Sequence, residues 1–132
     1  MKLLVVDDQG PVGEIISRIA TQSGWEAFHS VSAERLDERI RHHEIDVLLL
    51  DYAVDGNPWS ARNGLTVLRQ LRDAGITIPV ILFSGWSNLI DEKAANELGV
   101  LCVLEKPLGI KELRAALAEA KRKAHPASAD NE

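Results

Sequence analysis

The sequence predicts an α/β fold, a doubly wound parallel sheet of five strands with helices on both faces. Four short apolar runs are continuous rather than alternating, which is typical of parallel strands that are covered on both sides. Amphipathic helical patterns follow the runs, so the order strand–helix occurs five times along the chain. Because crossovers between parallel strands are right-handed, this order gives a twisted sheet between two layers of helices.

The strands are expected where the apolar residues are densest. Four runs carry this signal, namely "KLLVV" (2–6), "DVLLL" (46–50), "PVILF" (79–83) and "VLCVL" (100–104). The stretch "EAFHSV" (26–31) is weaker and more polar, which suits a strand at the edge of the sheet.

The helices are expected where apolar residues recur at helical spacing, each after one strand. Glycines mark the expected ends of the third and fourth helices, at Gly75 and Gly99. The five apolar stripes are Val12–Ile15–Ile16–Ile19–Ala20, Leu36–Ile40, Leu65–Leu68–Leu71, Leu89–Ile90–Ala94–Leu98 and Ile110–Leu113–Leu117–Ala120.

Composition limits the classes of protein that fit. A chain of 132 residues with 45% apolar content suits one domain, expected at 1–123, followed by a polar flexible tail at 124–132. A net charge of −5 gives no reason to expect direct binding to nucleic acid or to an anionic membrane. Cys102 is the single cysteine, so an internal disulfide is excluded, and no run resembles a membrane span or signal peptide. We expect a cytoplasmic protein.

Polar side chains follow the predicted strands at the edge where the strands end, which we call the carboxyl edge. Asp7 and Asp8 follow the first strand, Asp51 the third, Ser84 the fourth and Lys106 the fifth. Three carboxylates at one edge repel one another unless a cation lies between them, and Mg²⁺ is the natural choice. Lys106 adds a charge and Ser84 a hydroxyl for a phosphoryl group. One aspartate can then act as a nucleophile and form an acyl phosphate.

Four motifs in this order carry a resemblance to a known family. They are "VVDD" (5–8), "LLLD" (48–51), "FSG" (83–85) and "EKP" (105–107), and they resemble the receiver domain of two-component response regulators. The resemblance covers about residues 2–122. It implies a flavodoxin-like fold with strand order 2-1-3-4-5, and a signalling domain that catalyses only its own phosphoryl transfer and dephosphorylation.

The resemblance also implies a role for individual residues. Asp51 resembles the phosphoacceptor, which takes a phosphoryl group from a histidine kinase or phosphotransfer protein and then signals to a downstream effector. Asp8 resembles a direct Mg²⁺ ligand, Asp7 an acid that acts through water, and the Ala53 carbonyl a further ligand beside Asp51. Ser84 resembles the switch hydroxyl. In the same way, Lys106 resembles the lysine that contacts phosphate, and Pro107 the proline after a cis peptide bond.

The chain departs from the family pattern in two places. Gly64 lies thirteen residues after Asp51, so about five residues are inserted beside the site. The insertion is either a plain surface loop, which loops accommodate at small entropic cost, or a partner contact through Trp59 or Arg62. Val103 replaces the usual aromatic residue, which puts the customary coupling of the switch to a rotating ring in doubt.

Trp86, two residues beyond Ser84, is a further candidate for capping the pocket or contacting a partner.

Other interpretations stay open. Asp7 and Asp8 are explicable as helix caps, Ser84 as a cap and Lys106 as an ordinary loop lysine. A degenerate receiver would keep the fold as an interaction module without phosphorylation. An Mg²⁺-dependent phosphatase that uses an aspartyl phosphate would carry a second acid two residues after the nucleophile, where this chain has Ala53.

Overall fold

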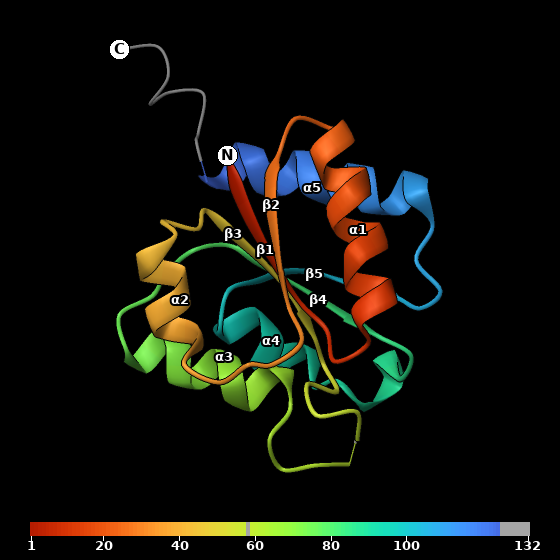
Figure 1. The fold of residues 1–132 in the computed structure, drawn as a ribbon. Helices are drawn as coiled ribbons and strands as arrows, with labels where there is room; N and C mark the ends of the chain where they lie inside the picture. Colours follow the sequence, from red (N-terminus) through yellow and green to blue (C-terminus); the bar gives the residue numbers. More distant parts are fainter. Residues whose placement is uncertain (58, 125–132) are drawn as a thin grey trace.

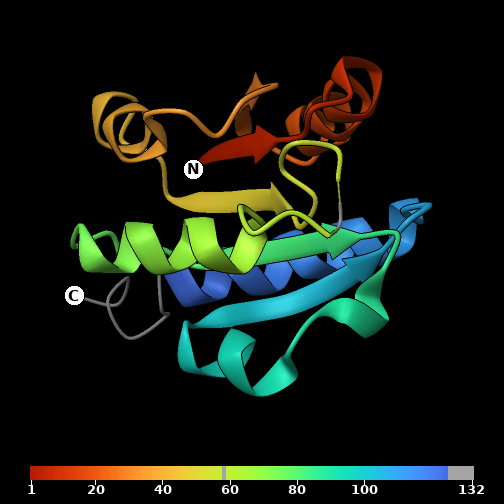
Figure 2. The same ribbon diagram turned by 90° about the horizontal axis from the view of Figure 1, so that it is seen from below.

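Five parallel strands form the centre of the protein, in a computed structural model that describes residues 1–57 and 59–124. The strand order is β2-β1-β3-β4-β5, which confirms the predicted fold, with β2 at one edge and β5 at the other (Figures 1 and 2). The strands are β1 (Lys2–Val6), β2 (Glu26–Ser30), β3 (Val47–Asp51), β4 (Val80–Ser84) and β5 (Val100–Glu105). The more polar stretch is therefore an edge strand, as its sequence predicts.

Helices cover both faces of the sheet. The helices are α1 (Gly10–Gln22), α2 (Leu36–His42), α3 (Gly64–Asp73), α4 (Glu92–Glu97) and α5 (Ile110–Ala124). Helices α1 and α5 lie on one face, and α2, α3 and α4 lie on the other (Figure 1). Successive side chains of a strand point to opposite faces, so Leu3 and Val5 join one core cluster, and Leu4 and Val6 join the other. This explains why the buried strands are apolar without alternation.

The fourth helical region differs from its prediction. Instead of one helix across its four apolar positions, the chain forms a 3₁₀ turn at Ser87–Leu89 and then the short helix α4. Asp91 separates them, because its side chain accepts hydrogen bonds from the backbone N–H groups of Lys93 and Ala94 and so begins a new helix.

Two members of the predicted apolar stripes face solvent. Ile15 is 58% exposed and Ile110 is 54% exposed. Both lie at the margin of a helical stripe, where the side chain points past the sheet instead of onto it. Cys102 is half-buried, because β5 is an edge strand.

The C-terminal part of the chain is helical further than expected, since α5 includes Ala124. The rest of the predicted tail lies outside the described residues, so the tail and the 1–123 boundary stay predictions. Within residues 1–57 and 59–124, no helix has both the length and the apolar character that crossing a membrane requires.

Candidate functional site

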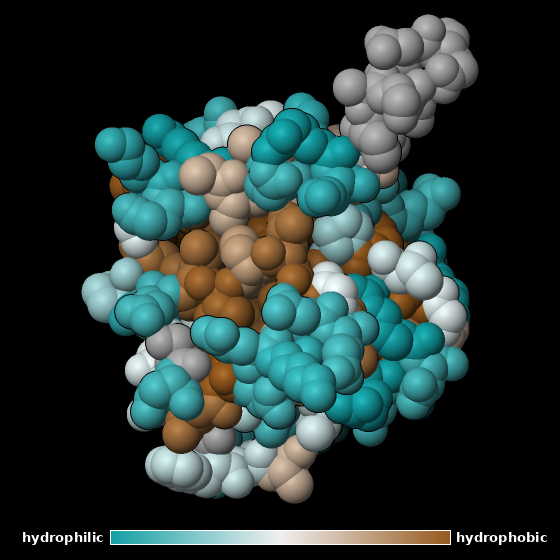
Figure 3. All heavy atoms as spheres, turned by 180° about the vertical axis from the view of Figure 1, so that it is seen from behind, coloured by the Kyte–Doolittle hydropathy of each residue, from teal (hydrophilic) through white to brown (hydrophobic). Residues whose placement is uncertain are grey.

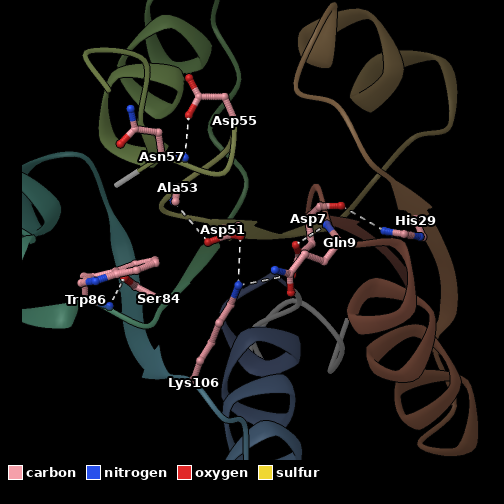
Figure 4. A network of polar contacts seen from close by, with 10 residues as sticks. All are labelled: Asp7, Gln9, His29, Asp51, Ala53, Asp55, Asn57, Ser84, Trp86 and Lys106. Atoms are coloured by element: carbon pink, nitrogen blue, oxygen red, sulfur yellow. Dashed lines mark hydrogen bonds and ion pairs between the residues drawn. The ribbon is translucent and has the colours of Figure 1, made fainter. Parts of the chain in front are cut away.

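The parallel register brings the predicted site residues to one edge. Val6 pairs with Leu50, Leu50 with Leu82, and Ser84 with Glu105, so the residues that end or follow these strands emerge together. Figure 4 shows Asp7, Asp51, Ser84 and Lys106 at this edge, from four different strand ends. The sequence motifs, far apart along the chain, therefore meet in one place.

Three aspartates form the centre of the site, which we call the acid cluster (Asp7, Asp8 and Asp51). Each offers a carboxylate oxygen, and these oxygens all lie within 4.8 Å of one another. Asp7 is 0% and Asp51 2% exposed, whereas Asp8 is exposed. One carboxylate therefore borders solvent while two are enclosed. Ionised carboxylates this close repel one another unless positive charge is supplied.

Lys106 supplies part of that positive charge from the end of β5. Its Nζ lies 3.0 Å from Asp51 Oδ2 and 3.5 Å from Asp7 Oδ2, and 4.8 Å from the centre of the Phe83 ring. The Lys106 backbone N–H donates to the Ser84 carbonyl at 2.9 Å, which fixes where the side chain starts. The Lys106–Pro107 peptide bond is cis, the conformation expected for Pro107.

Burial opposes the ionisation of the acid cluster more strongly than Lys106 favours it. Burial raises the pKa of Asp51 to about 6, although the Lys106 ammonium and the Ala53 N–H favour its ionised form. Burial also raises the pKa of Asp8, and the neighbouring Asp7 carboxylate raises it further. A cation at this edge is therefore favoured, because it would relieve the repulsion among the carboxylates.

The acid cluster also fits a hard divalent cation in its detailed geometry. Asp7 Oδ1 accepts the Gln9 backbone N–H at 2.8 Å, but the fully buried Oδ2 has no hydrogen-bond partner. A buried polar oxygen without such a partner is costly and is typical of a metal or water ligand. Carboxylate oxygens beside a backbone carbonyl are the donor set that Mg²⁺ prefers.

The candidate switch residues lie beside the acid cluster. Ser84 is 1% exposed, and its Oγ accepts the Trp86 backbone N–H at 2.8 Å (Figure 4). Trp86 itself is 44% exposed, and its role as a cap or a partner contact stays a prediction. Val103 is half-buried and packs against the core under α2, α3 and α4, so no aromatic ring occupies that position.

The segment after Asp51, which we call the 52–63 loop, begins buried and then turns outward. Ala53 and Val54 are each 4% exposed, whereas Trp59 is 76% exposed and Arg62 is also exposed. The structure therefore does not bring Trp59 or Arg62 into the acid cluster, and both remain candidates for a partner contact.

Two contacts at the site were not predicted from the sequence. The His29 ring lies with Nε2 3.3 Å from the Asp7 carbonyl oxygen, and scattered histidines gave no signal for it. The second contact is between Gly56 and Asp8. The dipeptide Asp55–Gly56 is typical of a turn with positive φ, so the sequence could have predicted the turn, although not its contact with Asp8.

The fold and the site together define a class, a doubly wound α/β domain with an acid cluster, a lysine and a hydroxyl at its carboxyl edge. The family model of the response regulator receiver domain matches residues 3–118. The chain belongs to the response regulator receiver domain family.

Solved structures agree with this assignment. The receiver domain of the Francisella response regulator 1452 is 25% identical, with a TM-score of 0.74 over 92% of this chain and 98% of that one. The receiver domain of NtrX from Brucella abortus is 23% identical, with a TM-score of 0.75 over 89% and 96%. A longer NtrX structure, in complex with ATP, is 22% identical with a TM-score of 0.78, and the match covers 93% of this chain but 27% of that one.

Proposed function

We propose that this receiver domain takes a phosphoryl group onto Asp51 from a histidine kinase or phosphotransfer protein, in a Mg²⁺-dependent reaction, and then changes conformation to signal to an effector. The observation that carries the proposal is the position of Asp51. It is a nearly buried carboxylate at a strand end, held by Lys106 at 3.0 Å and by the Ala53 N–H at 3.1 Å, inside the acid cluster.

Phosphoryl transfer requires an ionised nucleophile in a fixed direction. The Lys106 and Ala53 contacts orient the Asp51 carboxylate, and its pKa of about 6 leaves it mostly ionised at neutral pH. A carboxylate oxygen of Asp51 attacks phosphorus, the phosphorus–nitrogen bond of the donor phosphohistidine breaks, and its electron pair stays with the imidazole. The product is an acyl phosphate on Asp51, and attack by water later restores the carboxylate.

The charge at the site must be balanced while this happens. We assign the Mg²⁺ ligands to Asp8, Asp51 and the Ala53 carbonyl, with Asp7 acting through water. When bound, Mg²⁺ neutralises carboxylate and phosphoryl charge. Lys106 moves from Asp51 Oδ2 toward the phosphoryl oxygens, because a point charge on a flexible stem follows the stronger anion.

The signal leaves the site through Ser84. A phosphoryl group on Asp51 attracts the Ser84 hydroxyl, which then releases the Trp86 N–H that it accepts in this structure. Since Val103 has no ring to rotate, the change is carried by the 84–89 segment toward α4 and β5. Figure 3 shows apolar side chains gathered over β5, between α4 and α5, and the β5 residues Val100–Leu104 are half-buried. This surface suits an effector.

Partner contacts and location complete the proposal. Trp59 and Arg62 on the 52–63 loop, with Trp86, are the candidate contacts for a kinase or effector, because exposed tryptophans and arginines contribute strongly at interfaces. A cytoplasmic location, with no direct nucleic-acid or membrane binding, remains a prediction from the charge and composition.

The experiment is labelling with acetyl phosphate, with Mg²⁺ or with EDTA, followed by intact mass. The wild type should gain one phosphoryl group only with Mg²⁺, and Asp51→Asn should gain none. Asp37→Asn, which removes a partly exposed carboxylate of α2 that pairs with Arg41 outside the acid cluster, is the matched control and should label normally. An Asp51→Asn protein that labels in full would refute the assignment, and a wild type that never labels would favour the degenerate receiver.

A further inference from the structure

The beginning of the 52–63 loop is a fixed turn. The Gly56 N–H donates to the Ala53 carbonyl at 2.9 Å, which closes a turn over residues 53–56. Ala53 and Val54 anchor this turn, since each is 4% exposed. Gly56 has a φ of +84°, a conformation that side chains other than glycine rarely adopt. The position of Gly56 is therefore set by the end of β3.

This turn places Gly56 against an acid from another strand. A Cβ atom added at residue 56 would lie 2.8 Å from Asp8 Oδ2, closer than carbon and oxygen atoms approach without a bond. The Asp8 carboxylate therefore occupies the space in which any other residue at 56 would carry its side chain. A carboxylate oxygen of Asp8 also lies within 4.8 Å of one on Asp7. Although exposed, the Asp8 carboxylate therefore has close neighbours in both Gly56 and Asp7.

We propose that Gly56 is a positioning residue of the metal site, which sets the spacing between the Asp8 carboxylate and the Ala53 carbonyl. The Gly56 N–H donates a hydrogen bond to the Ala53 carbonyl oxygen. Because Gly56 has no side chain, there is room for the Asp8 carboxylate beside its Cα. This inference rests on the proposed function, because it concerns the same Mg²⁺ ligands. Octahedral Mg²⁺ tolerates small errors in ligand position poorly, so a residue that touches two ligands controls affinity.

The predicted consequence is a loss of Mg²⁺ affinity in Gly56→Ala. The new methyl group displaces the Asp8 carboxylate from its present position in the acid cluster. Mutation of a residue that orients a metal ligand typically lowers the metal affinity about tenfold to a hundredfold. We expect the Mg²⁺ dissociation constant of Gly56→Ala to be about tenfold higher than that of the wild type. A second variant, Gly56→Asn, tests the same contact, because asparagine tolerates positive φ better than alanine.

Backbone strain needs its own control, and Gly75 provides it. Gly75 follows Ala74, the C-cap of α3, and has a φ of +88°; a Cβ added there would meet no atom within 4 Å. Gly75→Ala therefore carries the strain of a positive φ without the steric contact. In EDTA, Gly56→Ala and Gly75→Ala should both lower the urea midpoint, because both carry the strain of a positive φ. Only the substitutions at Gly56 should weaken Mg²⁺ binding.

The experiment is a Mg²⁺ titration of wild type, Gly56→Ala, Gly56→Asn and Gly75→Ala by calorimetry. It is repeated in an Asp8→Ala background, where the steric partner is absent and Gly56→Ala should cause no further loss. Variants at Gly56 that bind Mg²⁺ like Gly75→Ala, or that lose the same factor with and without Asp8, would overturn the inference. A wild type that binds no Mg²⁺ would instead refute the proposed metal site itself.

Discussion

The charge of Asp51 should make the metal-free protein less stable as the pH rises. Burial raises the pKa of Asp51 from 3.8 to about 6, so the native state holds this proton more tightly than the unfolded chain. Between about pH 4 and pH 6 the unfolded state loses its proton first, and the free energy of unfolding falls. Above about pH 6 both states are ionised, and the deficit stays constant.

The size of the effect follows from the shift. About two pKa units at 1.36 kcal/mol each give a ceiling of about 3 kcal/mol. We expect about 1–3 kcal/mol, because Lys106 is 24% exposed and can follow the charge as it forms. Asp51→Asn removes this titration and keeps an acceptor for the Ala53 N–H, so in EDTA it should be more stable than wild type at pH 7.5.

The assay is urea unfolding in EDTA, followed by circular dichroism, from pH 4.5 to pH 8. The difference in unfolding free energy between Asp51→Asn and wild type should grow through the interval up to about pH 6 and then level off. Adding Mg²⁺ at pH 7.5 should shrink it, because a cation that binds only the native wild type stabilises that state. If the difference in unfolding free energy were the same at every pH, the raised pKa of a buried, ionised Asp51 would be refuted.

Three further predictions concern neighbouring features. Asp8→Ala should weaken Mg²⁺ binding in calorimetry more than Asp7→Ala does, since we assign Asp8 as a direct ligand; equal, negligible effects would point to helix capping. A beryllofluoride adduct should change the fluorescence of Trp86 in a variant whose other two tryptophans are phenylalanine, and Ser84→Ala should bind Mg²⁺ but lose most of this response. A response that survives Ser84→Ala would shift the output to the 52–63 loop. Gly64→Ala should cost about 1–3 kcal/mol in urea unfolding, because its Cβ would lie 3.0 Å from the Tyr52 Cα and 3.2 Å from the Asp51 carbonyl oxygen; unchanged stability would contradict this.

The sequence predicts the sheet well because the signals for it are local and strong. A continuous apolar run such as 46–50 is typical of a strand that is buried on both faces of a parallel sheet. Because parallel strands end at the same edge of the sheet, Asp51 and Lys106 then lie together. The break between the 3₁₀ turn and α4 was not predicted, because the apolar spacing across this segment is typical of one continuous helix. The Asp91 side chain begins a new helix within it, by accepting hydrogen bonds from the backbone.

Contacts between elements were beyond the sequence for a different reason. That Gly56 lies against Asp8 depends on the path of the 52–63 loop across the end of β1, and no periodicity encodes such a path. The lack of a hydrogen-bond partner at Asp7 Oδ2 likewise appears only when its burial and the position of the Gln9 N–H are known together. The sequence motifs identify the residues of the site, whereas the burial and the neighbours that shift their pKa values are known only from the packed structure.

The outer part of the 52–63 loop takes its shape from short-range bonds of its own. The Asn57, Trp59 and Arg62 backbone N–H groups each donate to a side chain two residues earlier, on Asp55, Asn57 and Ser60 respectively. Such a segment is modular, because residues can be gained or lost in it while the buried turn at 53–56 keeps its place. The chemistry that we propose for Asp51 and the partner contact that we propose for Trp59 and Arg62 are thus free to evolve separately, although only a few residues lie between them.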